Sequence, residues 1–255
     1  GVGVLSLCLC ILVIGTMGSG IALTNSWAAA TKQEQIERTT AVYQEQYAQS
    51  TAQVNKIYDM VPDGIAERFP RVFFYEPFDS VGGWTVGKSD NEYWAGEKSV
   101  SACYIWSIDS AKKNFLAWEP LPSVGDEKDF YFQADARLVE GSAVNSCYGI
   151  SFRRTSTDNY YLLAVCERSF YVGYIKDGIW NTISDWQKKW SLHLFDTNQL
   201  GVSADAADID IFINNEKVYS FTGDYQQGGR FGIVVQKFDK SFAKYKFDNI
   251  VIFKK

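Results

Sequence analysis

From Phe69 onward, short runs of aromatic and β-branched residues alternate with turn-forming residues, and this alternation restricts the fold more than any other feature. About thirteen such runs follow one another, with no helical pattern between them. Runs this short and closely spaced are typical of an antiparallel β-sandwich or barrel. Asn214 and Asn215 separate two of the runs, and because asparagine tolerates a positive φ, we expect a tight hairpin there. The sequence therefore predicts an all-β domain over residues 72–255.

One predicted hairpin, CYGISFRRTSTDNYYLLAVC at residues 147–166, has a cysteine at each end. A turn at residues 155–158 gives the strand pairs Arg154–Asn159, Phe152–Tyr161 and Ile150–Leu163. The alternation of side chains then predicts one face that enters the core, made of Tyr148, Ile150, Phe152, Tyr161, Leu163 and Val165. The cysteines lie on the opposite face, with Gly149, Ser151 and Ala164.

In this register Cys147 lies directly opposite Cys166. Opposed residues have Cβ atoms ~4.5–5.5 Å apart, and a disulfide needs ~3.5–4.5 Å, so little adjustment is required. We predict a Cys147–Cys166 disulfide and, from it, a domain that faces an oxidising compartment. The alternative is a pair of buried free thiols, with Cys103 as a competing partner.

The first 25 residues, GVGVLSLCLCILVIGTMGSGIALTN, contain no charged side chain. As a helix this run is long enough to cross a hydrocarbon core of ~30 Å, so we expect a transmembrane helix at residues 1–25. Gly15 and Ser19 are spaced so that another helix can approach closely. A secretory signal peptide with a cleavage site at residues 28–30 is the alternative.

Residues 26–61 are rich in Ala, Gln, Glu and Lys and predict a helical stalk that ends at Pro62. A linker at residues 62–71 follows. Two heptad positions carry apolar residues, which are Ile36, Tyr43 and Ile57 at one and Tyr47, Val54 and Val61 at the other. This pattern fits either a self-associating coiled coil or an amphipathic helix that lies on its own domain or on a neighbouring subunit.

Charge and histidine content argue against two classes of function. The net charge is −5, and the sequence has no extended Lys/Arg cluster, whereas a nucleic-acid-binding surface needs positive charge. The single histidine, His193, argues against a histidine-based triad and against a multi-histidine metal site. We therefore expect no nucleic-acid partner, no cofactor and no metal.

Seven motifs follow one another in a specific order: YEPFDSVGGW, FLAWEP, YGISFRRTSTDNYYLLAV, FYVGYIKDGIWNTISDW, NQLGVSADAADIDIFINNEKVYSF, GGRFGIVV and KFDNIVIF. Over residues 72–253 the chain resembles the concanavalin A-like lectin/glucanase superfamily, in particular bacterial membrane-anchored proteins with one span and a helical stalk. The resemblance implies a jelly-roll sandwich of two antiparallel sheets, with the first and last strands adjacent. Members of the superfamily bind or cleave glycans, or serve as structural and interaction modules.

The residues that cleave glycans in this superfamily are incompletely matched. Laminarinase-type enzymes carry Glu-x-Asp-x-x-Glu on one strand, because two carboxylates must flank the scissile bond. The nearest match, Asp208-Ile-Asp210, lacks a glutamate and the third carboxylate. Asp126, Glu127 and Asp129 lie in a predicted loop without catalytic spacing. Asp79 and Asp248, which the terminal strands would bring near each other, are read as turn carboxylates and not as a calcium site. The chain is thus predicted not to be an enzyme.

Glycan binding instead requires exposed aromatic platforms beside polar side chains. Most tryptophans of such a domain fill its core. We select Trp94, beside Tyr93 and Asn91, and Trp186 as the exposed candidates.

These features predict a non-catalytic, single-pass membrane protein whose extracytoplasmic sandwich binds glycans or proteins. A variant is an accessory or structural subunit of a membrane complex, and the partners of its first helix are the bilayer or neighbouring transmembrane helices. The alternative is a pilin-like filament subunit, although Leu5 stands where bacterial pilins carry a glutamate. A glycoside hydrolase ranks third.

Overall fold

The computed structural model describes residues 35, 37–42, 44–45, 51–112, 114–122, 124–223 and 227–255. The chain divides into two compact units, Gly1–Gln53 and Val54–Lys255, and each is described by itself. The described residues of the first unit are helical, and the Thr39 hydroxyl donates a hydrogen bond to the Gln35 carbonyl oxygen (2.8 Å). The predicted span at residues 1–25, with Gly15 and Ser19, lies outside the described residues. Among those described, no helix has the length and apolarity needed to cross a membrane.

In its described part, the second unit forms fifteen strands after a short helix, α2 (Ile65–Arg68). The strands are β1 (Arg71–Glu76), β2 (Gly87–Asp90), β3 (Trp94–Val100), β4 (Tyr104–Ala111), β5 (Phe115–Pro120), β6 (Phe130–Gly141), β7 (Ser146–Ser156), β8 (Asn159–Cys166), β9 (Ser169–Lys176), β10 (Ile179–Lys188), β11 (Asn198–Asp205), β12 (Asp208–Ile213), β13 (Glu216–Thr222), β14 (Arg230–Lys237) and β15 (Ala243–Lys254).

The sequence pattern merged β3 and β4 into one run and gave no signal for β2. The run KSVSACYIW divides into the end of β3 and the start of β4, because Ala102 has a positive φ of 52° and turns the chain. The polar strand β2 has no hydrophobic signal of its own, since only one of its four residues is even half-buried. The hairpin at Asn214 and Asn215 is confirmed: both residues have positive φ and they join β12 to β13.

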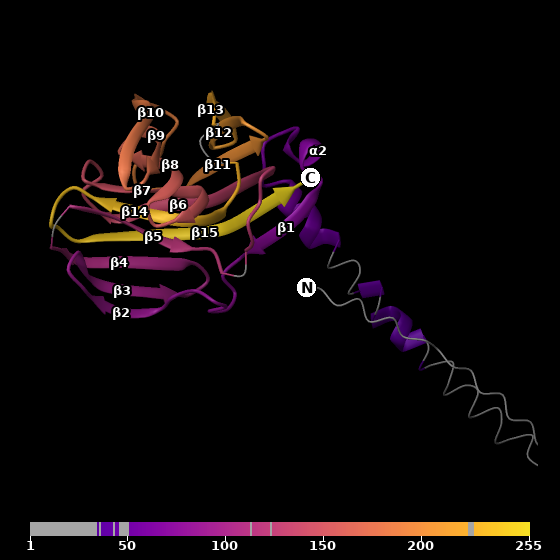
Figure 1. Ribbon diagram of the computed structural model, residues 1–255. Helices are drawn as coiled ribbons and strands as arrows, with labels where there is room; N and C mark the ends of the chain where they lie inside the picture. Colours follow the sequence, from indigo (N-terminus) through magenta and orange to yellow (C-terminus); the bar gives the residue numbers. More distant parts are fainter. Residues whose placement is uncertain are drawn as a thin grey trace, which may run out of the picture. The chain divides into compact units, whose positions relative to one another are not determined.

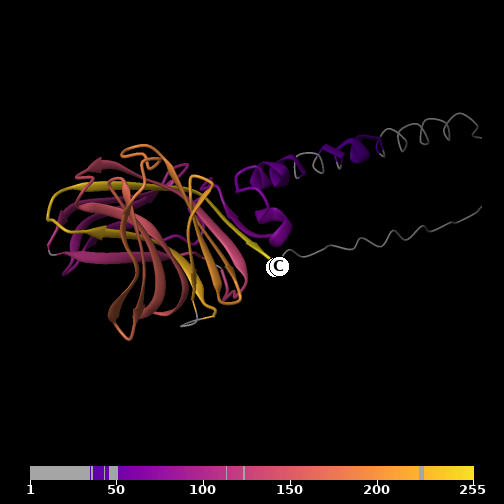
Figure 2. The ribbon, with the colours of Figure 1, turned by 90° about the horizontal axis from the view of Figure 1, so that it is seen from above.

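The strands form two antiparallel sheets, whose long strands run side by side and curve along their length (Figures 1 and 2). The first has nine strands in the order β13-β12-β11-β6-β15-β4-β3-β2, with β1 paired to β15. The second has six strands in the order β10-β9-β8-β7-β14-β5. The first and last strands, β1 and β15, are neighbours, as the resemblance implied.

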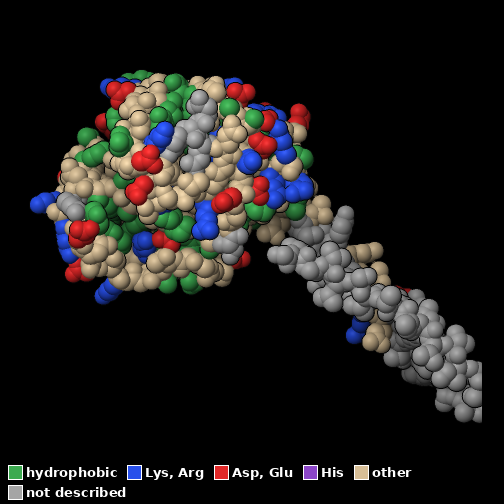
Figure 3. All heavy atoms as spheres, viewed as in Figure 1, with side chains coloured by type: hydrophobic (Ala, Val, Ile, Leu, Met, Phe, Trp, Pro, Cys, Tyr) green, Lys and Arg blue, Asp and Glu red, His purple; other side chains and the backbone are tan. Residues whose placement is uncertain are grey.

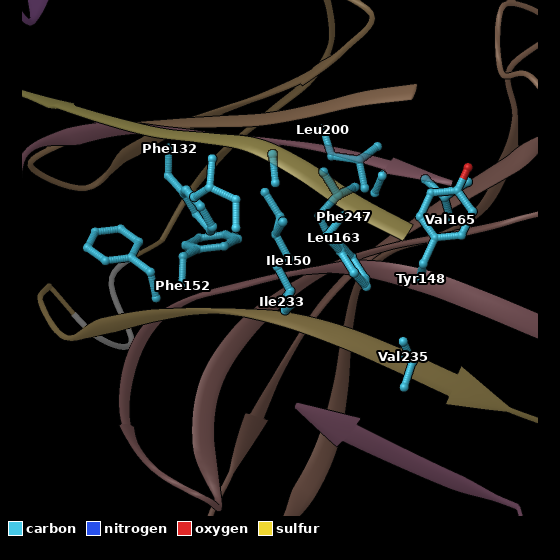
Figure 4. Packing of buried hydrophobic residues seen from close by; sticks show 14 of the residues in the cluster. Phe132, Tyr148, Ile150, Phe152, Leu163, Val165, Leu200, Ile233, Val235 and Phe247 are labelled. Atoms are coloured by element: carbon cyan, nitrogen blue, oxygen red, sulfur yellow. The ribbon is translucent and has the colours of Figure 1, made fainter. Parts of the chain in front are cut away.

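The core lies between the two sheets. Alternate residues of each strand point inward, and Figure 4 shows side chains from both sheets meeting there: Phe132, Leu200 and Phe247 from the nine-stranded sheet and Tyr148, Ile150, Phe152, Leu163, Val165, Ile233 and Val235 from the six-stranded sheet. The predicted inward face of the cysteine hairpin is therefore confirmed.

The hairpin β7–β8 keeps the predicted register near its base and departs from it near its tip. Ile150 pairs with Leu163 and Phe152 with Tyr161, as expected. The predicted pair Arg154–Asn159 is wrong, because the register shifts beyond Phe152 and Asn159 pairs with Ser156 instead. At the base, Cys147 and Cys166 form a disulfide with their Cα atoms 4.5 Å apart, and Cys103 is a buried free thiol.

A second, smaller cluster covers the outside of the nine-stranded sheet. Residues 54–58 are helical, and Ile57 and Val61 are buried together with Ile65 and Phe69 of the α2 region. They pack against side chains that point away from the main core, namely Tyr131, Phe212, Val251 and Phe253. In the second unit, these residues of the predicted stalk and linker thus belong to the packed domain. Tyr43, Tyr47 and Ile36 of the predicted heptad pattern lie outside the described residues.

Candidate functional site

The six-stranded sheet has a face turned away from the core, which we call its outer face. Its inner strands present two tyrosines there, Tyr160 on β8 and Tyr171 on β9, and otherwise mostly small or aliphatic residues: Gly149, Ser151, Leu162, Ala164, Gly173, Gly232 and Val234. Large aromatic residues occupy the two edges, with Trp118 on β5 and Trp180 and Trp186 on β10. The outer face thus carries tryptophans on both of its edge strands.

A bulge in β7 decides which of two neighbouring arginines reaches this face. Arg153 has a positive φ of 49°, and the register with both β8 and β14 shifts there. In a regular strand, Phe152 in the core would be followed by Arg153 outward and Arg154 inward. The extra residue reverses this order. Arg153 turns inward and Arg154 lies on the outer face.

Arg153 uses its charge to hold three loops together. Its guanidinium donates hydrogen bonds to the carbonyl oxygens of Gly223 (3.1 Å), Lys128 (3.2 Å) and Ala206. These carbonyls belong to the segments that follow β13, precede β6 and follow β11. Arg153 is fully buried, so its role is structural.

Arg154 has a different environment. Its side chain is only 4% exposed, and its guanidinium lies over the ring of Trp118 and 5.1 Å from the ring centre of Tyr160. Nε donates to the Ser156 carbonyl oxygen (2.7 Å), whereas Nη1 and Nη2 are buried without a hydrogen-bond acceptor among the described residues. Burial lowers the pKa of Arg154 to about 10, despite the opposing effects of Tyr160 and Asp158, so it remains a cation at neutral pH.

Arg154 lines a pocket of about 410 Å³ at one end of the outer face. The other lining residues are Trp118, Pro120, Asp126, Thr155, Ser156, Thr157 and Arg230. Arg230 pairs directly with Arg154 across the two strands, and its Nε lies 3.8 Å from the Asp126 carboxylate. The pocket therefore combines an aromatic ring, three hydroxyl-bearing residues, two cations and one carboxylate.

Gly229 allows the chain before Arg230 to pass close to the bulge. Its φ is 140°, and a Cβ at this position would lie 2.6 Å from the backbone carbon of Arg153 and 2.6 Å from the backbone nitrogen of Arg154. Any larger residue would push the two strands apart at the pocket.

Aromatic residues at the β10 edge form a separate group on the same face. The Tyr171 ring lies 5.4 Å from that of Trp180 and 5.5 Å from that of Trp186. Trp180 is 41% exposed and Trp186 is 39% exposed. Trp186 also borders a smaller pocket of about 230 Å³ beside the disulfide. The predicted platform residue Trp186 thus lies on the outer face, with an exposed ring.

The other predicted platform is wrong. Trp94 is only 5% exposed and packs in the main core against Trp106, with ring centres 5.8 Å apart. Asn91 accepts hydrogen bonds from the backbone nitrogens of Tyr93 (2.8 Å) and Trp94 (3.0 Å), so it shapes the turn before β3. Tyr93 is exposed, but it lies in the turn between β2 and β3, at the nine-stranded sheet and not on the outer face or at its pocket.

The sequence reasoning missed Trp118, Arg154 and Arg230. The sequence feature that could have pointed to this pocket is the pair of adjacent arginines before the hairpin turn, Arg153 and Arg154. Alternation alone assigns them to the wrong faces, because the bulge does not show in the sequence.

The carboxylates of the laminarinase-like motif lie on β12 of the nine-stranded sheet. Asp208 is exposed, and Asp210 accepts a hydrogen bond from Ser220 (2.7 Å) and pairs with Lys217 (3.6 Å) and Arg68 (3.4 Å). Partial burial by itself would raise the pKa of Asp210, but these partners outweigh it and lower the pKa. Asp210 therefore holds α2 and β13 to the sheet.

The loop carboxylates also have separate partners. Glu127 pairs with Lys254 (2.9 Å), and Asp129 accepts a hydrogen bond from the Ala206 backbone nitrogen (2.7 Å). Asp248 was expected in a turn, but it lies within β15, where it pairs with Lys246 (3.0 Å). Within the residues that the structure describes, no group of three or more His, Cys, Asp or Glu side chains is placed to hold a metal ion.

No protein-family model matches this chain, and no curated protein matches it. Solved structures do. A laminarinase from Flavobacterium sp. UMI-01 has a TM-score of 0.55 at 11% identity, over 72% of this chain and 100% of that chain. A mixed linkage glucan GH16 protein from Bacteroides ovatus has a TM-score of 0.55 at 10% identity, over 71% of this chain and 99% of that chain.

A Bacillus subtilis protein of unknown function with a galectin-like fold has a TM-score of 0.53 at 9% identity, over 73% of this chain and 97% of that chain. At these identities the likeness concerns the fold. The two face-to-face antiparallel sheets and the adjacent terminal strands agree with it. The second unit therefore has the concanavalin A-like jelly-roll fold that its motifs resemble.

Proposed function

We propose that the second unit is a non-catalytic glycan-binding module. The pocket at the end of the outer face carries this proposal, because it combines the Trp118 ring with hydroxyl and guanidinium groups in about 410 Å³. A cavity of this size is within the range of small-molecule sites. An aromatic ring packs against the apolar face of a sugar, and polar groups at the rim bind its hydroxyls. Solved proteins of the same fold include a laminarinase and a mixed linkage glucan GH16 protein, which supports a saccharide ligand.

The lining of the pocket supports binding without cleavage. Glycoside hydrolysis requires two carboxyl groups on either side of the scissile bond, and Asp126 is the single carboxylate among the described lining residues.

We further propose that the module is displayed outside the cytoplasm on a membrane-anchored chain. The Cys147–Cys166 disulfide supports an oxidising compartment. The uncharged run at residues 1–25 supports an anchor in the bilayer or among neighbouring helices. Lys/Arg and Asp/Glu side chains are interspersed over the face of the sandwich drawn in Figure 3, which does not favour a nucleic-acid partner. The filament alternative depends on residues 1–34, outside the described residues.

A glycan panel tests the module. We expect the full chain to bind at least one class of oligosaccharide by calorimetry, and Trp118→Ala to weaken that binding at least tenfold because the ring contact is lost. Trp190→Ala is the matched control, because Trp190 is the most exposed tryptophan among the described residues and does not line the pocket.

A reducing-sugar assay on the same panel tests the non-catalytic claim. We expect no release of reducing ends. Release that Asp126→Asn abolishes would establish a hydrolase instead. Absence of binding to every oligosaccharide would overturn the glycan-binding proposal.

A further inference from the structure

Arg154 is a buried cation with only part of its hydrogen-bonding capacity satisfied within the fold. The side chain is only 4% exposed, yet Nη1 and Nη2 have no hydrogen-bond acceptor among the described residues. A cation removed from water without an acceptor destabilises a protein. Such a group is retained at a cost, and it offers two parallel N–H donors to a planar anion that enters the pocket.

The balance of charges in the pocket also favours an anionic ligand. Arg230 lies directly opposite Arg154, and like charges in directly opposed positions are destabilising. Asp126 lies near Arg230 and can balance one of these two charges. Asp158 acts on Arg154 electrostatically, but it does not line the pocket and accepts no hydrogen bond from Nη1 or Nη2, so the Arg154 charge remains without a facing carboxylate among the lining residues. An anionic ligand would complete the pair and relieve the repulsion.

The remaining lining residues suit a sugar more than a simple ion. Thr155, Ser156 and Thr157 place three hydroxyl-bearing residues at the tip of the hairpin, beside Arg154. Trp118 adds an aromatic surface in the same pocket. A free inorganic anion could accept hydrogen bonds from the guanidinium and the hydroxyls but would leave the Trp118 ring unused, whereas a sugar ring would use all three kinds of group.

We infer that this pocket binds an anionic sugar residue, one that carries a carboxylate or a sulfate ester, with the Arg154 guanidinium as its anion-binding group. The inference rests on the proposed glycan-binding function and adds the class of glycan. Both anions accept two hydrogen bonds from one guanidinium, so their shared chemistry defines the site.

Two matched pairs of probes test the inference by calorimetry with the full chain. The first pair is oligogalacturonate and the same oligomer after reduction of its carboxyl groups. The second is a sulfated dextran oligomer and the unmodified dextran oligomer. We expect at least one charged member to bind at least tenfold more tightly than its neutral partner at low salt, and this preference to shrink as NaCl is added.

Variants identify the group responsible. Arg154→Gln should remove most of the preference for the charged member, and Arg230→Gln, at the exposed rim, should reduce it by a smaller factor. Lys88→Gln is the control, since it removes the same charge from the exposed strand β2 of the other sheet and should leave the preference unchanged. If Arg154→Gln fails to fold, Arg230→Gln and the salt dependence of the unmodified chain still decide the matter.

The outcomes separate this inference from the function on which it rests. Preference for the carboxylate or for the sulfate assigns the anion. Equal binding of charged and neutral members would overturn the inference and leave glycan binding intact. If a charge preference persists in Arg154→Gln, the site lies elsewhere and the inference is wrong. If no member of either pair binds, the inference is wrong, and the glycan panel separately tests whether the module binds any oligosaccharide.

Discussion

Arg153 and Arg154 are neighbours in the sequence, yet they lie on opposite sides of the six-stranded sheet and their charges serve different ends. On the inner side, Arg153 donates to the carbonyl oxygens of three loops. On the outer side, Arg154 keeps two buried nitrogens without an acceptor among the described residues. The comparison teaches that burial alone does not distinguish a structural cation from a binding group. The number of its hydrogen-bond partners does.

The same criterion separates the two acidic groups that the sequence offered. Asp210 on the nine-stranded sheet is surrounded by Ser220, Lys217 and Arg68, so its charge is already engaged in the fold. Asp126 in the pocket lies 3.8 Å from one exposed arginine. Asp210 is thus held by three neighbouring side chains, whereas Asp126 has a single, more distant partner.

The largest expected effect comes from the inner arginine. Arg153→Met should lower the free energy of unfolding by about 4 kcal/mol, because three carbonyl oxygens, one of them on a buried residue, lose a charged donor at ~1–3 kcal/mol each. For a domain of this size the melting temperature should fall by roughly 10 °C. Urea denaturation and calorimetry measure both quantities.

The matched control is Arg154→Met, which removes the same group one residue later. It should change stability by no more than about 1 kcal/mol, because the loss of one hydrogen bond, from Nε to the Ser156 carbonyl oxygen, is offset by the removal of a buried charge whose Nη1 and Nη2 have no acceptor among the described residues. Equal losses in the two variants would break the comparison between the two sides of the sheet.

The disulfide at the other end of β7 should have the next largest effect. Replacing Cys147 and Cys166 by alanine together should destabilise the domain by about 3 kcal/mol, as the chain-entropy estimate gives for a loop closed by residues 19 apart. Reductant should lower the stability of the unmodified chain by a similar amount and leave the double variant unaffected. Cys103→Ala serves as the control, and sensitivity of stability to reductant in the double variant would show that the wrong pair had been assigned.

The smallest effect concerns a third cation, Lys237. It is buried, with Nζ 2.7 Å from Asp239 and 2.7 Å from Ser146. Burial alone would raise the pKa of Asp239, but hydrogen bonds from Lys237 and Ser241 and the charge of Lys237 lower it to about 2. Asp239→Asn should therefore cost about 2 kcal/mol at neutral pH, less than for a fully buried pair because Asp239 is partly exposed.

The sign of the pH dependence follows from that lowered pKa. In the unfolded chain an aspartate titrates near ~3.9, so the stabilisation by Asp239 is present above that pH and is lost as the pH falls towards 2. The difference in melting temperature between the unmodified chain and Asp239→Asn should thus shrink between about pH 4 and pH 2. A difference that stays constant over this window would show that the ion pair does not contribute.

Much of the fold could be predicted because β-strand signals are local. The inward residues Ile150, Phe152 and Leu163 follow directly from alternation, and Asn214 and Asn215 identify their hairpin because few residues accept positive φ. β2 could not be predicted, since it carries almost no buried residue and is defined by its pairing with β3. Trp94 was misplaced because a tryptophan beside polar neighbours looks the same whether its ring points into the core or outward.

The sequence by itself determined an all-β domain, the face of each long strand that enters the core, and the cysteine pair, because these depend on alternation and on spacing along one hairpin. Only the tertiary structure decided the bulge at Arg153, the burial of Ile57 and Val61 on the outside of the nine-stranded sheet, and the meeting of Trp118, Arg154 and Arg230 in one pocket. These features depend on the register between strands that are far apart in the chain. That register is set by how both sheets pack at once, and a local pattern of residues does not contain it.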